Sequence, residues 1–297
     1  IALPVMIFCG FRFIGGDREE RRVCLGIGLL AMLIGSLLFL WQWALSGDPW
    51  MNLYTLWWPY DRLGFGPGIG VTESGHNLYW AIYNTRFSLA AGIHDLFGWP
   101  WLSWILLPLG LLALRKDRDG WLTFSVFPGL VLVYGFYWVG AWLFGPRYYV
   151  ESVPGLAMIS AAGIAWIGGW FAPSQIVSQA RVYATSTLVL LLLVVNVVFY
   201  LPLRLGGMRE LYNIGREPME LLAGADLDQA LVIVHAERWF EYARYLLLTE
   251  PFSDSDLLIA WSATPEQDLR LIKTFGERAI YFLDPNHPDI LEVLVGT

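Results

Sequence analysis

The sequence predicts a mainly α-helical, polytopic membrane protein with a small α/β domain at its C-terminal end. Hydrophobic residues make up 56% of the 297 residues, and charged residues only 15%. The mean hydropathy is +0.50, and tryptophan occurs 16 times. A soluble domain of this size does not need so much apolar surface. We therefore expect the larger part of the chain to lie in a membrane.

Six apolar runs make up this larger part, and they cover residues 1–14, 23–45, 96–114, 121–144, 153–173 and 182–203. Five of them approach or exceed the roughly 20 residues that a transmembrane helix needs, and the first is shorter. The chain begins inside this first run and without an initiator Met. We therefore expect about six transmembrane helices, the first truncated, in the C-terminal part of a longer protein.

Arginine and lysine near the ends of spans favour the cytoplasmic side of the membrane. The first, third and fifth connections carry most of them, namely Arg12, Arg18, Arg21, Arg22, Arg115, Lys116, Arg118 and Arg181. The other connections are longer and carry only Arg62, Arg86 and Arg147. This asymmetry predicts a cell-membrane protein in which residues 46–98, the turn at Arg147 and the C-terminal domain face the extracytoplasmic side.

Residues 1–203 are expected to form the transmembrane region and residues 204–297 the soluble extracytoplasmic domain. From residue 201 onward the chain has 8 basic and 16 acidic residues, a net charge of −8, whereas residues 1–200 carry +1. Such an acidic domain lacks the basic footprint of a nucleic-acid binder. The glycines Gly206, Gly207 and Gly215 indicate a linker over residues 204–217.

Within the soluble domain, buried strands are predicted at residues 230–234, 257–261 and 279–283, with helices at 237–248 and 265–275. Thr264, Pro265 and Gln267 form a capping-box start for the second helix. Strands that alternate with helices indicate a parallel sheet with right-handed crossovers. No G-x-G-x-x-G follows a strand, so dinucleotide binding is disfavoured. Residues 284–289 are interpreted as a proline-rich turn rather than a metal site.

The predicted spans carry almost no ionisable residue near their centres, which disfavours a transporter. The fifth span has small residues at every fourth position, and this ridge predicts close helix packing: Ala157, Ala161, Ala165 and Gly169. Chemistry is therefore expected on the outer face, where two segments combine charged residues with glycine or proline.

The first segment, residues 61–76, contains Asp61, Arg62, Glu73 and His76. Its glycines permit close approach of the backbone to a ligand. The following residues 77–97 have apolar side chains at helical spacing, which predicts an interfacial helix from which Arg86 projects. The alternative interpretation is a structural loop with solvated charges and a hydrogen-bonded His76.

The second segment, residues 145–151, places Arg147 and Tyr148 directly after a Gly-Pro pair. An arginine held by such a turn can bind a lipid phosphate with paired N–H donors. The alternative is an arginine that extends to any phospholipid headgroup.

These segments resemble the GT-C superfamily of membrane glycosyltransferases. The Gly-Pro-Arg-Tyr sequence at 145–148, followed by Pro154, Ala157 and Gly163, is similar to a segment of protein O-mannosyltransferases and of the lipid A aminoarabinose transferase. A bacterial branch of the superfamily is similar in four further places, namely residues 61–66, 75–76, 84–86 and 96–100. The resemblance covers about residues 45–200 and reaches the C-terminal domain only loosely.

The resemblance implies an inverting glycosyltransferase that moves a sugar from a polyprenyl-phosphate carrier to an acceptor outside the membrane. The acceptor is left open as a protein, lipid or glycan. The family's catalytic base lies in an outer loop that would precede Ile1, so no catalytic residue is assigned and the chain alone is expected to be inactive. Arg147 and Tyr148 are expected to hold the carrier phosphate, and a further set to shape the pocket: Asp61, Arg62, Glu73, His76 and Arg86. No metal ligand is assigned, and a divalent cation as cofactor stays open.

A second hypothesis comes from a different functional class. It is a non-enzymatic membrane scaffold or envelope-assembly protein whose exported domain binds a partner. The acidity of that domain and its lack of a nucleotide fingerprint are compatible with this role. An acidic pair after an upstream span would favour the transferase, and a short or absent upstream region would favour the scaffold.

Overall fold

The computed structural model describes residues 2–56, 58–140, 147–170, 178–211, 214–250, 255–262 and 264–295. Backbone contacts divide the chain into two units, Ile1–Leu203 and Arg204–Thr297. The division lies close to the point where the sequence becomes strongly acidic. Each unit has its own packing and is described by itself.

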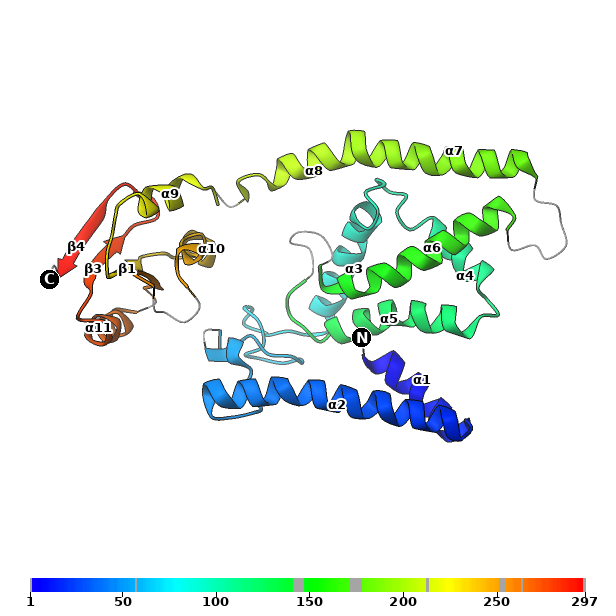
Figure 1. The fold of residues 1–297 in the computed structure, drawn as a ribbon, viewed down its shortest axis with the longest axis horizontal. Coiled ribbons are helices and arrows are strands. Elements are labelled where there is room, and N and C mark those ends of the chain that lie inside the picture. Colours follow the sequence, from blue (N-terminus) through cyan, green and yellow to red (C-terminus); the bar gives the residue numbers. More distant parts are fainter. Residues whose placement is uncertain are drawn as a thin grey trace. The chain divides into compact units, whose positions relative to one another are not determined.

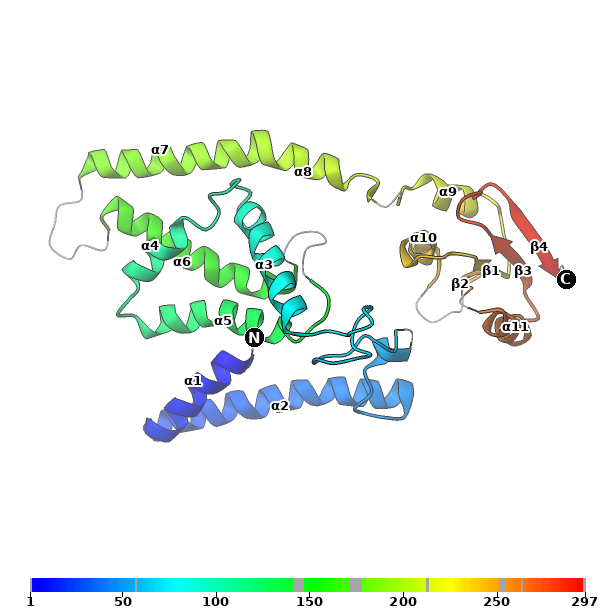
Figure 2. The same ribbon diagram turned by 180° about the vertical axis from the view of Figure 1, so that it is seen from behind.

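The first unit is helical (Figures 1 and 2). Its elements are α1 (Ala2–Gly15), α2 (Arg18–Ser46), η1 (Leu53–Leu56), α3 (Leu78–Asp95), α4 (Leu106–Ala113), α5 (Arg118–Tyr134), η2 (Arg147–Ser152), α6 (Val153–Gly168), α7 (Gln179–Val195) and η3 (Asn196–Tyr200), and α8 (Leu201–Met208) continues across the division between the units. Asp17 begins α2, because its carboxylate accepts the backbone N–H groups of Glu19 and Glu20 at 2.9 Å. Gly47 ends α2 in the left-handed conformation.

Three helices of the described chain are long and apolar enough to cross a membrane. They are α2, the combined segment Arg147–Gly168 of η2 and α6, and the combined segment Gln179–Met208 of α7, η3 and α8. The chain is therefore a membrane protein with at least these candidate spans.

The six predicted spans are thus found only in part, and the run at residues 96–114 differs most. Gly98 and Trp101 both have left-handed backbone, with φ of 63° and 64°, so no helix passes through this region. The helix that remains, α4, has 8 residues. A helix of that length extends about 12 Å, which is less than half of the roughly 30 Å hydrocarbon core.

Helices α4 and α6 cross at a backbone-to-backbone contact. A Cβ at Gly163 would lie 3.0 Å from the Gly110 nitrogen, so only glycine allows this approach. Ile159 and Ser160 are buried on the same side of α6, whereas Ala161 is exposed. The predicted ridge through Ala161 is therefore not the surface that packs against α4, because the absence of a side chain at Gly163 decides the contact.

The π-helical turn η3 fastens the C-terminal end of α3. The Asn196 amide donates to the Phe97 carbonyl at 2.7 Å, and the Tyr200 hydroxyl donates to the Asp95 carboxylate at 2.7 Å. Gly98 lies against both side chains, and a Cβ there would overlap them. These two bonds join segments that are 99 and 105 residues apart in the sequence.

The second unit is a four-stranded sheet with helices on both faces. The elements are α9 (Glu217–Ala223), β1 (Ala230–Val234), α10 (Trp239–Ala243), η5 (Tyr245–Leu248), β2 (Leu257–Trp261), α11 (Pro265–Thr274), β3 (Ala279–Leu283) and β4 (Leu291–Val295). The strand order is β2-β1-β3-β4, with β1 parallel to β2 and β3, and β3 antiparallel to β4. The three predicted strands are confirmed, but β4 makes the sheet mixed rather than parallel.

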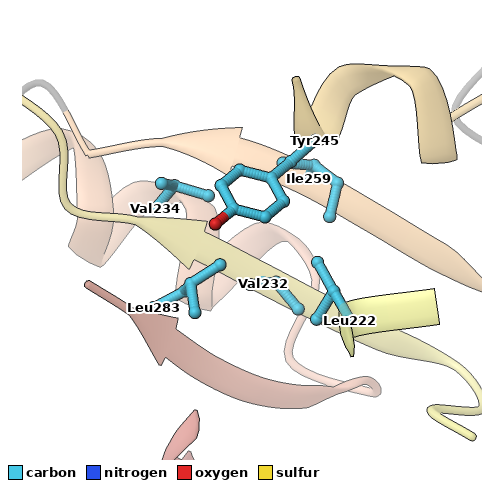
Figure 3. Packing of buried hydrophobic residues seen from close by; sticks show 6 residues of the cluster. All are labelled: Leu222, Val232, Val234, Tyr245, Ile259 and Leu283. Atoms are coloured by element: carbon cyan, nitrogen blue, oxygen red, sulfur yellow. The ribbon is translucent and has the colours of Figure 1, made fainter. Parts of the chain in front are cut away.

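Two apolar layers hold this sheet. On one face Val232 and Val234 pack with Leu283 and with Tyr245 of η5 (Figure 3). On the other face Leu231 and Ile233 pack against α11. This alternation follows from the period of two along a strand.

Two helical predictions in this unit need correction. The helix predicted over 237–248 is split at Arg244 into α10 and η5. The linker predicted from residue 204 begins later, because α8 continues through Gly206 and Gly207 to Met208. The cap of α11 is confirmed, since the Thr264 hydroxyl accepts the Gln267 N–H at 3.3 Å.

Gly163→Leu should destabilise the first unit, whereas Ala161→Leu should not. The first substitution forces a side chain into the contact between α4 and α6 and is expected to cost about 1–3 kcal/mol or more. The second adds the same side chain two residues away on an exposed position. Thermal unfolding of both variants in detergent micelles tests this, and equal midpoints would contradict the packing described.

Candidate functional site

The glycine-rich segment forms an ordered loop that is attached to the residues after α5. The Gly64 N–H donates to the Phe136 carbonyl at 2.8 Å, and the Gly66 N–H donates to the His76 carbonyl at 2.8 Å. Gly75 has a φ of 68°, and a Cβ there would overlap the Gly66 carbonyl. The glycines therefore serve the close approach of the loop to itself, in addition to any approach to a ligand.

Asp61 lies inside this loop and is only 7% exposed. Its carboxylate accepts the indole N–H of Trp138 at 2.9 Å. Its backbone carbonyl accepts the Asn52 amide at 3.0 Å. Burial raises the pKa of the Tyr137 phenol, and a hydrogen bond with Asp61 together with the charge of that carboxylate raises it further. Tyr137 is thus held as a neutral hydrogen-bond donor beside Asp61.

His76 is buried, with 2% exposure, under the same loop. Its Nε2 lies 3.0 Å from the Gly135 carbonyl, and because a carbonyl only accepts, Nε2 carries the proton. The ring stacks on Phe65 with a centroid distance of 5.1 Å. No described residue hydrogen-bonds to its Nδ1. Through these contacts His76 fixes the loop to the residues after α5.

Arg147 and Tyr148 lie at the start of η2, next to the aromatic end of α5. The Arg147 guanidinium donates to the Tyr148 hydroxyl at 3.3 Å and lies over its ring at 5.1 Å. Tyr148 stacks on Tyr134 at 4.8 Å and meets Tyr137 edge-on at 5.7 Å. Gly145 and Pro146, which belong to the same predicted turn, lie outside the described residues.

The structure joins the two predicted segments through Tyr137. The charge of the Asp61 carboxylate raises the pKa of this phenol, and the Tyr137 ring meets the Tyr148 ring edge-on at 5.7 Å. Asp61, Tyr137, Tyr148 and the Arg147 guanidinium therefore belong to one cluster of neighbouring side chains. In the sequence the two segments are separated by about 70 residues, and only the fold brings them together.

An apolar groove of about 700 Å³ lies between α3 and the end of α5. One wall is α3, through Leu78, Ile82, Leu89 and Ile93, which belong to the predicted helical stripe. The other wall is the end of α5 with Phe136. Apart from the Trp104 indole, the polar side chains of the lining are Thr85 and Arg86. That α3 lies on a membrane surface stays a prediction.

The remaining predicted pocket residues are not brought into this site. Arg62 and Glu73 are both exposed, and neither side chain has a hydrogen-bond or ion-pair partner among the described residues. Of the seven predicted residues, the structure links Asp61, Arg147 and Tyr148 and places Arg86 on the groove.

Sequence reasoning missed Tyr137 and Trp138, which lie at the centre of the site. It assigned both to an apolar run at 121–144, although α5 ends at Tyr134. Trp138 donates to Asp61, and its carbonyl accepts the Asn84 amide of α3 at 2.8 Å. The available indication was the cluster of aromatic residues after Gly135, because Tyr and Trp concentrate at membrane interfaces.

Metal ligands are not gathered anywhere in the part of the chain that the structure describes. No three or more His, Cys, Asp or Glu side chains are placed there to hold a metal ion. The segment at 284–289 forms a turn, in which the Asp284 carboxylate accepts the Asn286 N–H at 2.9 Å. It connects β3 to β4.

Asp61→Ala should lower the stability of the first unit by about 1–3 kcal/mol, because it leaves the indole N–H of Trp138 buried without an acceptor. Asp61→Asn should cost less, since its amide oxygen can still accept that bond. Arg62→Ala, the neighbouring exposed position, should change stability by less than about 0.5 kcal/mol. Chemical unfolding in micelles measures all three, and equal effects of Asp61→Ala and Arg62→Ala would refute the buried role of Asp61.

Comparison with protein families, with curated proteins and with solved structures finds no match for this chain. An assignment of function therefore depends on the geometry of the site and on the residues that form it.

Proposed function

We propose that the first unit binds a polyprenyl-phosphate-linked sugar at the outer face of the cell membrane, as part of an inverting glycosyltransferase. The observations that support this most are the apolar groove between α3 and α5, with Arg86 on its wall, and the Arg147–Tyr148 pair, which stacks on Tyr134 of α5. This combination suits a ligand with a long apolar chain and an anionic head.

The groove supplies the apolar part of this recognition. Four aliphatic side chains of α3 and the aromatic Phe136 line it. An isoprenoid chain buried there would lose contact with water or headgroups and gain about 25 cal/mol for each Å² of apolar surface removed. The groove opens along a helix of a membrane protein, where such a chain is available from the bilayer.

The arginines supply the polar part. The Arg86 side chain is exposed and has no hydrogen-bond or ion-pair partner among the described residues. The Arg147 guanidinium is exposed too, and Tyr148 occupies only one of its donors. A phosphate accepts paired N–H donors from such a group. Tyr149 of η2 lies close to α3, because it lines a small cavity together with Ser88 and Gly92 of that helix.

The proposed transfer needs a base for the acceptor and positive charge for the departing phosphate. Asp61 is an unsuitable base, because it is buried and already accepts from Trp138. Its proposed role is to hold Tyr137, and through it Tyr148, beside Arg147. No base is assigned among the described residues, and the second unit is expected on the outer side of the membrane.

Arg86→Ala and Arg147→Ala should each weaken binding of a polyprenyl phosphate about tenfold or more, since each removes a charged phosphate contact. Arg147→Lys should lie between Arg147→Ala and the unchanged protein. The matched control is Arg115→Ala, an exposed arginine of the predicted cytoplasmic side. Native mass spectrometry of the chain in micelles measures binding, with the polyprenol of the same chain length as the ligand that lacks phosphate. Equal binding of both ligands, or equal loss in the control, would exclude the phosphate site.

Transfer itself is tested in the intact protein in its native membrane. Arg147→Lys should strongly reduce sugar transfer from a polyprenyl-linked donor, because a point charge does not replace a planar pair of donors. The chain of residues 1–297 alone should show no turnover. Unchanged transfer by Arg147→Lys would remove Arg147 from the site, and turnover by the chain alone would show that the base lies within it.

A further inference from the structure

The second unit has a cleft of about 600 Å³ at the carboxyl ends of β1 and β3. His235 directly follows β1 and Asp284 directly follows β3. The backbone N–H of His235 donates to the Leu283 carbonyl at 2.9 Å, so the two strand ends are fixed side by side. Glu237, which lies shortly after β1, and Glu292 of β4 also line the cleft.

The topology of the sheet places this cleft where α/β folds bind ligands. The chain leaves β1 for β2 on one side and later returns to β3 on the other side of β1. The first connection includes η5, which packs on one face, and the second includes α11, which packs on the opposite face. The β1–β3 boundary is therefore the point at which the direction of the crossovers reverses. Ligands of open α/β sheets bind outside the carboxyl ends of the strands at such a point.

Part of the lining is occupied by contacts within the protein. Glu241 accepts the backbone N–H groups of Glu237 and Arg238 at 3.0 and 3.1 Å, and the Arg238 side chain at 2.7 Å. Burial opposes ionisation of Glu241, but the hydrogen bonds and charge of Arg238 keep the pKa of that carboxyl below its ordinary value. Glu241 and Arg238 thus form a fixed wall, from which the exposed guanidinium still presents donors.

Other groups of the lining are free among the described residues. The side chains of Glu237, His287 and Glu292 have no hydrogen-bond or ion-pair partner there, and His235 has only a ring contact with Phe282 at 4.6 Å. The carboxylates accept hydrogen bonds, whereas Arg238 donates them, and a histidine ring can do either. Phe282 and Ile290 add apolar surface to the same cleft.

We propose that this cleft binds a saccharide. Each hydroxyl of a sugar both donates and accepts, so it can use the carboxylates, the histidines and Arg238 together, while the C–H face of the ring packs on Phe282. A phosphate or nucleotide would be repelled by the carboxylates. A simple cation would use the carboxylates but leave Arg238 and the apolar surface without a role. This proposal does not depend on the transferase activity of the first unit.

Saturation-transfer NMR on the full chain, in a detergent without a sugar headgroup, tests the proposal. The probes are the methyl glycosides of glucose, galactose, mannose and N-acetylglucosamine, with putrescine and inorganic phosphate as cationic and anionic competitors. We expect at least one glycoside to receive saturation and neither competitor to displace it. The double variant Glu237→Ala, Glu292→Ala should weaken that binding about tenfold, because it removes two free acceptors.

The matched control is Glu266→Ala, Glu277→Ala, which removes the same charge from exposed positions outside the cleft. It should bind like the unchanged chain, and thermal unfolding of both double variants checks that they are folded. The proposal is overturned if no glycoside binds, if both double variants weaken binding equally, if the cleft variant binds normally, or if putrescine or phosphate displaces the glycoside. None of these results bears on the polyprenyl-phosphate experiments, which measure binding to arginine variants of the first unit.

Discussion

The attachment of the glycine-rich loop to the four residues after α5 is the constraint on which the site depends. It consists of His76 bonded to the Gly135 carbonyl, Gly64 bonded to the Phe136 carbonyl, and Trp138 bonded to the Asp61 carboxylate. Each bond joins residues about 60 to 80 positions apart in the sequence. The side chains of Asp61 and His76, which take part in two of the bonds, are polar and buried. Buried polar groups are costly when unpaired, so these bonds fix the loop in one arrangement.

The consequence for function is that charged groups from distant segments come to share one region. Asp61 raises the pKa of the Tyr137 phenol, the Tyr137 ring meets the Tyr148 ring edge-on, and Tyr148 lies under Arg147. The aromatic rings provide rigid spacing, and the carboxylate provides a fixed acceptor at the inner end. A polar ligand at Arg147 would therefore meet a group whose position is set by packing, which is the requirement for selective recognition.

The sequence predicts the second unit better than the first. The strands at 230–234, 257–261 and 279–283 are continuous apolar runs between turn residues, and local pattern is sufficient to locate them. In β4 the apolar and polar residues alternate less clearly, and the strand is brought to β3 by the turn at 284–289. In the first unit hydropathy alone does not show where a helix stops. The ends of α4 and α5 depend on left-handed residues at 98 and 101 and on long-range bonds at 135–138, and neither is visible in a window of apolar residues.

The π turn at Asn196–Tyr200 changes the geometry of the helix that contains it. A π turn accommodates one residue more than an α turn, so the side chains before and after it are out of phase by about a quarter of a revolution or more. The faces of α7 and α8 therefore do not continue one another, although the helix axis does. The face of α7 that contacts α6 is therefore rotated by about 100° in α8. The two bonds from Asn196 and Tyr200 to the end of α3 thus mark where one long helix changes the direction of its contacts.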